Sequence, residues 1–167
     1  ESNSALSQQT LLISANQVSG SAQAITSGDG GFLAFITPAF VSQLDIIDNV
    51  ADGLRTNGAG GFFSLVSGRV GTANVLGNHF TSLICPNPGV GNDGGAIYIT
   101  SEDLPVANLF FEANTLEDIH GFSNGGALNI AGKGIQNALV SNNTWKNITA
   151  RNYGGMACFY NSSLTGT

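Results

Sequence analysis

Charged side chains are scarce in this sequence. Lys and Arg number five and Asp and Glu eleven among 167 residues, so 10% of the chain is charged, against about 25% in ordinary soluble domains. With a net charge of −6 and so few cations, the chain cannot form a basic stripe, and we expect no nucleic-acid partner. No apolar run approaches the roughly 18 residues of a membrane span, so we expect no span in this segment.

Helical periodicity is lacking as well. The short apolar segments alternate instead, as in Ile97-Tyr98-Ile99 and Leu128-Asn129-Ile130, and this pattern is typical of strands. Glycine, with 23 residues, and asparagine take the place of charged residues. The chain opens on Glu1 and shows no signal-peptide pattern, which we interpret as the mark of a processed or excised product.

A Gly-Gly pair opens a short apolar run five times. The first glycines stand at positions 30, 60, 94, 125 and 154, in steps of 30, 34, 31 and 29 residues. Self-similarity at such a period indicates a stacked repeat architecture. The pairs are Gly30 and Gly31, Gly60 and Gly61, Gly94 and Gly95, Gly125 and Gly126, and Gly154 and Gly155.

An asparagine that follows an apolar residue by three positions marks every unit too. From the first glycine of a pair to the next such asparagine the offsets are 19, 18, 20 and 18 residues, so two independent markers keep one phase. Each unit of about 31 residues also holds three short apolar segments. The asparagines are Asn16, Asn49, Asn78, Asn114 and Asn143.

Three strands per turn, with turns stacked, describe a parallel β-helix. We predict an all-β solenoid of about five coils of three short strands, with residues 1–167 as a single domain roughly 25 Å long at ~4.8 Å per coil. Glycine permits positive φ or close approach of stacked corners. Asparagine tolerates the left-handed region and can hydrogen-bond along a column. We therefore expect Gly-Gly and Asn ladders at equivalent corners.

The middle of the chain resembles a known family. Gly94-Gly95-Ala96-Ile97 followed by Phe111-Glu112-Ala113-Asn114 resembles the paired GGA(I/L) and FxxN motifs of polymorphic outer-membrane adhesins, which are autotransporter-type passenger domains. Gly125-Gly126-Ala127-Leu128 with Val140-Ser141-Asn142-Asn143 is similar, whereas the other three units have Phe or Met in place of the Ala. More broadly, the chain is similar to the pectin-lyase-like superfamily, which implies a right-handed β-helix. That superfamily includes adhesins, lyases, hydrolases and phage fibres, so the resemblance implies no single function.

Both ends of the chain stop within the repeat pattern, without a capping helix or a polar terminal repeat. An uncapped coil presents a row of unpaired backbone groups, which is a template for further pairing. We expect one of two arrangements, which can coexist. Either the chain is a segment of a longer β-helix, or copies of the chain cover its ends and form a head-to-tail, non-closing fibre.

Three N-x-S/T sequons cluster late in the chain, at Asn142, Asn147 and Asn161. Such sequons arise by chance in an Asn- and Ser-rich sequence and have meaning only on a secretory route. Glycosylation and chance therefore both stand as interpretations. Asn147 is the strongest candidate, because it lies in a polar stretch with Lys146 and Arg151.

The longest corner, residues 85–93, is the best candidate for a contact loop, because insertions in solenoids map to loops on one face. A simple spacer is the alternative. Cys85 and Cys158 belong to coils about two levels apart, on the order of 10 Å, which favours two free thiols over a disulfide with its ~7 Å limit. The candidate binding residues are Pro86, Asn87, Pro88, Asn92 and Asp93.

Acidic, basic and histidine residues are the candidates for catalytic groups. Lyases of the resembled superfamily use Ca²⁺ held by carboxylates and a basic residue, and its hydrolases set Asp residues on adjacent coils. Here Asp52, Glu117 and Lys146 share one offset from the repeated asparagine, but the two acids are two coils apart. We interpret them as a solvated surface stripe. His79 and His120 fall at different offsets and predict no metal pair.

Aromatic side chains allow one comparison between units. Phe80, Leu116 and Trp145 all stand two residues after the repeated asparagine, which predicts an apolar interior column. A sugar-stacking role for Trp145 is the alternative.

The sequence thus favours a non-catalytic structural or adhesive scaffold, located outside the cell or on the cell surface. End-to-end association and a glycan or cell-surface ligand are the partners we consider, and we expect neither a cofactor nor a metal. A polysaccharide lyase or glycoside hydrolase of the pectin-lyase-like superfamily is the alternative function.

Overall fold

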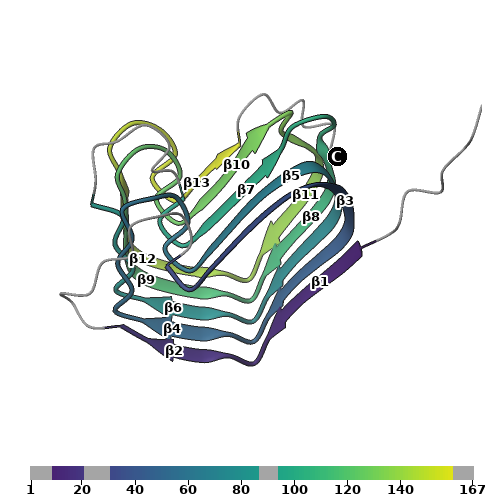
Figure 1. The fold of residues 1–167 in the computed structure, drawn as a ribbon. Coiled ribbons are helices and arrows are strands. Elements are labelled where there is room, and N and C mark those ends of the chain that lie inside the picture. The colour runs from purple at the N-terminus through teal and green to yellow at the C-terminus, as the bar shows by residue number, and fades with distance from the viewer. Residues whose placement is uncertain (1–8, 21–30, 87–93, 160–167) are drawn as a thin grey trace, which may run out of the picture.

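The computed structural model describes residues 9–20, 31–86 and 94–159 (Figure 1). Within these ranges all regular structure is β-strand and no helix occurs. The strands are β1 (Gln9–Ser14), β2 (Gln17–Ser19), β3 (Leu33–Ile47), β4 (Val50–Asp52), β5 (Phe63–Leu76), β6 (His79–Thr81), β7 (Ile97–Ser101), β8 (Val106–Glu112), β9 (Thr115–Gly121), β10 (Leu128–Gly132), β11 (Ile135–Ser141), β12 (Thr144–Ala150) and β13 (Ala157–Phe159).

The strands wind as a parallel solenoid with three faces (Figure 1). The first face stacks the first halves of β3 and β5 with β7, β10 and β13. The second face stacks β1, the second halves of β3 and β5, β8 and β11. The third face is a five-stranded sheet in the order β12-β9-β6-β4-β2. Five strand levels on each face correspond to about four turns, which confirms the predicted all-β solenoid.

Two strands are much longer than the sequence predicted. β3 has 15 residues and β5 has 14, and each runs from the first face into the second without a break. Their mutual register shifts between Thr37 and Phe40, where both strands bend. Because parallel pairing survives this bend, the first two faces form one continuous eight-stranded sheet. Later coils interrupt the same corner, between β7 and β8 and between β10 and β11.

The interior consists of columns of apolar residues that lie one coil apart. Ile46, Val75 and Phe111 are paired neighbours on the second face, and none of their side chains is exposed. On the third face Phe80 pairs with Leu116, both fully buried. Parallel in-register pairing places like side chains over like, so that the short strands bury a continuous core that no single coil could form.

Candidate functional site

The asparagine ladder occupies the corner between the second and third faces. Asn49, Asn78 and Asn114 are each no more than 1% exposed. The backbone N–H and Nδ2 of each ladder residue donate to Oδ1 of the ladder residue one coil later, with distances between 2.9 and 3.1 Å. This ladder, formed by Asn16, Asn49, Asn78, Asn114 and Asn143, was predicted from the sequence spacing.

The second hydrogen of each Nδ2 from Asn49 onward is donated to the coil before, to the backbone carbonyl of the residue three positions before that coil's ladder asparagine. Asn49 donates to the carbonyl of Ile13, and Asn78 donates to that of Ile46. Asn114 and Asn143 repeat the contact with Val75 and Phe111, at 2.8 and 2.7 Å. Every amide group inside the stack therefore has its hydrogen bonds satisfied, as burial of polar groups requires.

The left-handed backbone conformation is adopted by the residue before each ladder asparagine, and not by the asparagine itself. The residue before each ladder asparagine has φ between 53° and 65°, whereas no ladder asparagine has positive φ. Asparagine is therefore needed for its amide, and its neighbour takes the strained conformation. These neighbours are Ala15, Asp48, Gly77, Ala113 and Asn142. A second left-handed column, four residues after the ladder, contains Gly53, Ser82, Asp118 and Asn147.

The Gly-Gly corners work by close approach. The first glycine of each described pair from Gly60 onward has φ between 61° and 70°. The second glycine faces the backbone carbonyl of its counterpart one coil later, so a Cβ on Gly61 would overlap the oxygen of Gly95. Gly31, Gly95 and Gly126 are equally confined, whereas a Cβ on Gly155 would meet nothing within 4 Å. Gly30 lies outside the described residues.

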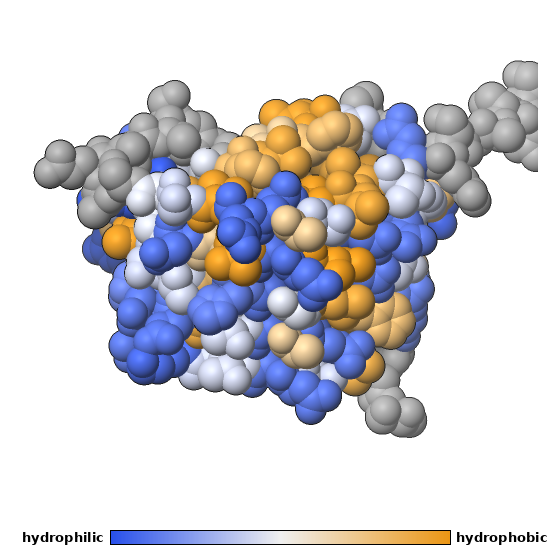
Figure 2. Space-filling view, turned by 90° about the horizontal axis from the view of Figure 1, so that it is seen from below, coloured by the Kyte–Doolittle hydropathy of each residue, from blue (hydrophilic) through white to orange (hydrophobic). Residues whose placement is uncertain are grey.

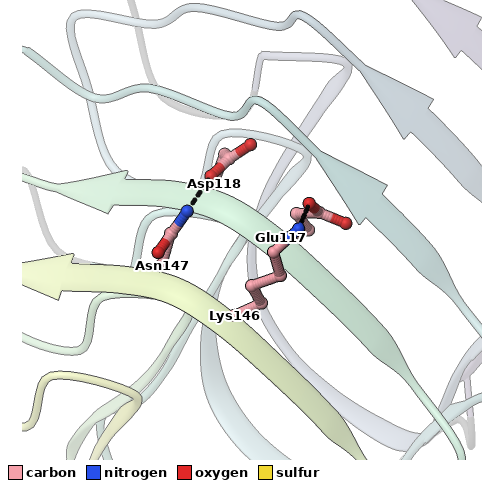
Figure 3. Close-up of polar contacts among 4 residues, drawn as sticks. All are labelled: Glu117, Asp118, Lys146 and Asn147. Carbon is pink, nitrogen blue, oxygen red and sulfur yellow. Dashed lines mark hydrogen bonds and ion pairs between the residues drawn. The ribbon is translucent and has the colours of Figure 1, made fainter.

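Polar side chains on the outer surface of the third face also pair from coil to coil (Figure 3). Asp52 on β4 accepts from the Thr81 hydroxyl on β6 at 2.8 Å. Glu117 on β9 forms an ion pair with Lys146 on β12, as the sequence offsets predicted for one face. Beside that ion pair, Asn147 Nδ2 donates to Asp118 Oδ1 at 2.8 Å.

The Glu117–Lys146 contact decides the protonation state of the lysine. The hydrogen bond from Lys146 to Glu117, together with the negative charge of that carboxylate, raises the pKa of Lys146 above its usual value. The ammonium therefore stays protonated at neutral pH and is a poor proton acceptor. Because the Lys146 side chain is 61% exposed, the pair contributes little to stability.

Two further carboxylates follow the same coil-to-coil pattern on the second face. Asp45 accepts from Asn74 Nδ2 at 2.6 Å, and Glu112 accepts from the Ser141 hydroxyl at 2.8 Å. A cationic side chain also contacts a residue one coil away: the Arg69 guanidinium lies 4.7 Å from the centre of the Phe40 ring, and Phe40 and Arg69 are paired neighbours. Polar side chains here link neighbouring coils, and no three His, Cys, Asp or Glu residues of the described ranges gather as metal ligands.

The sequon residues differ in their surroundings. Asn142 is exposed in the left-handed region, whereas Asn147 is exposed but bonded to Asp118. The hydroxyl of Thr149, the third residue of the Asn147 sequon, lies 2.7 Å from His120 Nδ1. Asn161 lies outside the described residues, and glycosylation of all three remains a prediction.

Other predicted positions are only partly described. Pro86 is half-buried at the end of the second described range, while Asn87, Pro88, Asn92 and Asp93 lie outside the described residues. Cys85 is buried and Cys158 is half-buried, and they form no disulfide with each other, as favoured from the sequence. Trp145 pairs with Leu116 and its ring stacks on Phe111, with centroids 5.4 Å apart, so it belongs to the interior column.

Sequence reasoning missed the coil-to-coil pairs of Asp45 with Asn74 and of Glu112 with Ser141. The offset between their partners is 29 residues, which is the same period as the repeat, so the signal was present in the sequence. No helix in the described part of the chain is long and apolar enough to cross a membrane. Comparisons with protein-family models, curated proteins and solved structures find no match to this chain.

Proposed function

We propose that this chain is a non-catalytic structural scaffold that works outside the cell or on the cell surface. One observation carries the proposal: carboxylates that could serve chemistry are bonded to a residue one coil away. Asp45, Asp52 and Glu112 each accept a hydrogen bond from such a residue. Glu117 and Asp118 are held in the same way by β12 (Figure 3). A column of such pairs links neighbouring coils, so these five acids are engaged as structural acceptors.

The surface location and an adhesive role are supported by the motif resemblance of the two central units to polymorphic outer-membrane adhesins. Membership of the pectin-lyase-like superfamily belongs to the same proposal. Labelling of intact cells of the source organism with an antibody against the chain tests the location. The proposal expects signal without permeabilisation, and signal that requires permeabilisation would contradict it.

The catalytic alternative is tested by turnover. The chain is incubated with polygalacturonate and a panel of acidic and neutral polysaccharides, with and without Ca²⁺, and unsaturated products and new reducing ends are measured. The scaffold proposal expects neither above a boiled control. Turnover that disappears in both Glu117→Gln and Asp118→Asn, with Thr81→Ala as a matched surface control that keeps it, would replace the scaffold with an enzyme.

A further inference from the structure

The asparagine ladder has a direction, and its two ends are chemically opposite. Each ladder residue donates toward the C-terminal end and accepts from the N-terminal end. Asn16 therefore presents its Oδ1 without a donor among the described residues. Asn143 presents its backbone N–H and one Nδ2 hydrogen without an acceptor in the described ranges, since its other Nδ2 hydrogen goes to Phe111.

The backbone beside the ladder shows the same polarity. The residue before a ladder asparagine donates to the coil that follows it, as Ala113 N–H does to Ser141 O at 3.1 Å. In the last described coil Asn142 occupies this place. The residue after a ladder asparagine donates to the coil that precedes it, as Thr144 N–H does to Asn114 O at 2.8 Å. In the first described coil Gln17 occupies this place, with its N–H directed away from β4.

Exposed apolar side chains lie in the same end coils as these unpaired backbone and amide groups. At the C-terminal end Val140, which continues the buried column of Val75 and Phe111, is 45% exposed, and Leu139 is 47% exposed. At the N-terminal end Leu12 is 61% exposed. Figure 2 views the molecule from the side on which β1 and β2 are lowest in Figure 1, and shows several hydrophobic patches interspersed with hydrophilic residues.

Charged side chains and proline, two usual protections of an edge strand, are absent from β1, β2 and β11, although the pairing of β1 with β3 shifts its register between Gln9 and Thr10. Edge strands normally avoid pairing through charged side chains, proline or bulges. Residues 9–20, which contain β1 and β2, include no charged residue and no proline, and neither does β11. Lys146 is the single charged residue of β12, and it is engaged with Glu117.

We propose that a second copy of this chain stacks on the C-terminal coil through its own N-terminal coil. β1 and β2 of one molecule then extend the sheets at β11 and β12 of the other. Asn143 donates to Asn16 Oδ1 across the junction, and the Asn143 carbonyl accepts from the Gln17 N–H. The second copy is the occupant that fits, because its first coil supplies an acceptor, a donor and an uncharged edge in the required phase.

The apolar columns continue in the same register. With Asn143 beside Asn16, Val140 meets Ile13 and Leu139 meets Leu12. Trp145 meets Val18 along the column that already holds Leu116, so no charged side chain opposes another of like sign. The contact joins unlike ends and does not close, so repetition produces a fibre. The proposal deepens the scaffold role and rests on it.

A pair of variants at Gln17 tests the N-terminal side. Gln17→Pro removes a backbone donor for which residues 9–20, 31–86 and 94–159 provide no acceptor, and Gln17→Ala keeps that donor as the matched control. Sedimentation velocity is measured on the 167-residue chain at rising concentration, with circular dichroism to confirm the β fold. Wild type and Gln17→Ala are expected to form a ladder of larger species, and Gln17→Pro to associate at least about tenfold more weakly.

Val140→Lys tests the C-terminal side, with Val140→Leu as its control. At an open end the lysine stem can cover Phe111 while the ammonium reaches water. In a joined pair the ammonium would be buried against Ile13, so association should fall at least about tenfold. A mixture of Gln17→Pro and Val140→Lys keeps one intact end on each partner, and should give a 1:1 dimer and nothing longer.

The outcomes separate cleanly. A 1:1 dimer in the mixture, with each variant monomeric alone, supports the head-to-tail junction. Association of either variant alone that is as strong as that of wild type would mean that the altered end takes no part in the contact, which overturns it. Monomers of wild type at every concentration would also overturn it. Because catalysis is measured separately, that result leaves the scaffold function standing.

Discussion

The second glycine of each pair illustrates how one residue position controls the whole stack. Its α-carbon faces the carbonyl of the equivalent glycine one coil later, so the corner has room for hydrogen only. At the same position in the last described coil, a Cβ on Gly155 would meet no atom of the described residues within 4 Å. The chain thus carries its own matched pair of test sites.

Gly95→Ala is expected to lower the free energy of unfolding by more than about 2 kcal/mol, because the new methyl group overlaps Gly126 and the overpacked corner must shift. Gly155→Ala should change it by less than about 0.5 kcal/mol, since the methyl group enters open space. Urea unfolding followed by circular dichroism measures both. Equal effects at the two sites would contradict the stacked corner.

Asn78 lies at the middle of the ladder and makes the same full set of contacts as Asn49 and Asn114. Asn78→Ala removes the acceptor of Asn49 and leaves the Ile46 carbonyl without its donor, all in a fully buried corner. We expect a loss of about 2–4 kcal/mol in the free energy of unfolding. Asn16→Ala removes one partly buried side-chain hydrogen bond and should cost only about 1 kcal/mol. Denaturant titration would count against the ladder if the two losses were alike.

Lys146 gives a pH prediction with a definite sign. Because Glu117 raises the pKa of Lys146 in the folded chain, its small stabilising contribution is present below about pH 10.5 and is lost as pH rises through the raised folded pKa. Glu117→Gln should return the NMR titration midpoint of Lys146 toward its ordinary value. Thr81→Ala, one coil away, is the control and should leave that midpoint unchanged.

At the scale of the element, the repeat phase was predictable and the strand lengths were not. Gly-Gly and asparagine recur in the sequence because their side chains meet identical neighbours in every coil. The corner within β3 and β5 has no such signal, because pairing continues through a gradual bend that many residues can adopt. The left-handed positions were missed for a similar reason: Ala15, Asp48 and Ala113 share a conformation but no side-chain chemistry.

Edge elements should be less protected than central ones, since each coil is held only by its neighbours. In the monomer the amide of Ala113, bonded to Ser141, should exchange with solvent slowly, whereas the amides of Asn142 and Asn143 should exchange fast. Association should slow the latter two selectively. Residue-resolved hydrogen exchange at low and high concentration measures this, and uniform protection along the chain would contradict it.

At the scale of the whole molecule, one geometric relation recurs: residues about one repeat apart in the sequence lie next to each other in neighbouring coils. Apolar columns, the asparagine ladder, the glycine corners and the carboxylate pairs all join residues 29 to 39 positions apart. The low charge of the chain follows from the same relation, because like charges stacked one coil apart would repel. The direction of the asparagine ladder is a consequence at this scale, and the proposed scaffold function rests on the same relation.

The most direct measurement is the set of side-chain amide contacts in an NMR spectrum of the isotope-labelled 17.1 kDa chain. We expect nuclear Overhauser contacts between the side-chain amides of Asn49 and Asn78, and between those of Asn78 and Asn114. Contacts of these three amides with sequence neighbours alone would contradict the stacking of successive coils, and with it the proposed function and assembly.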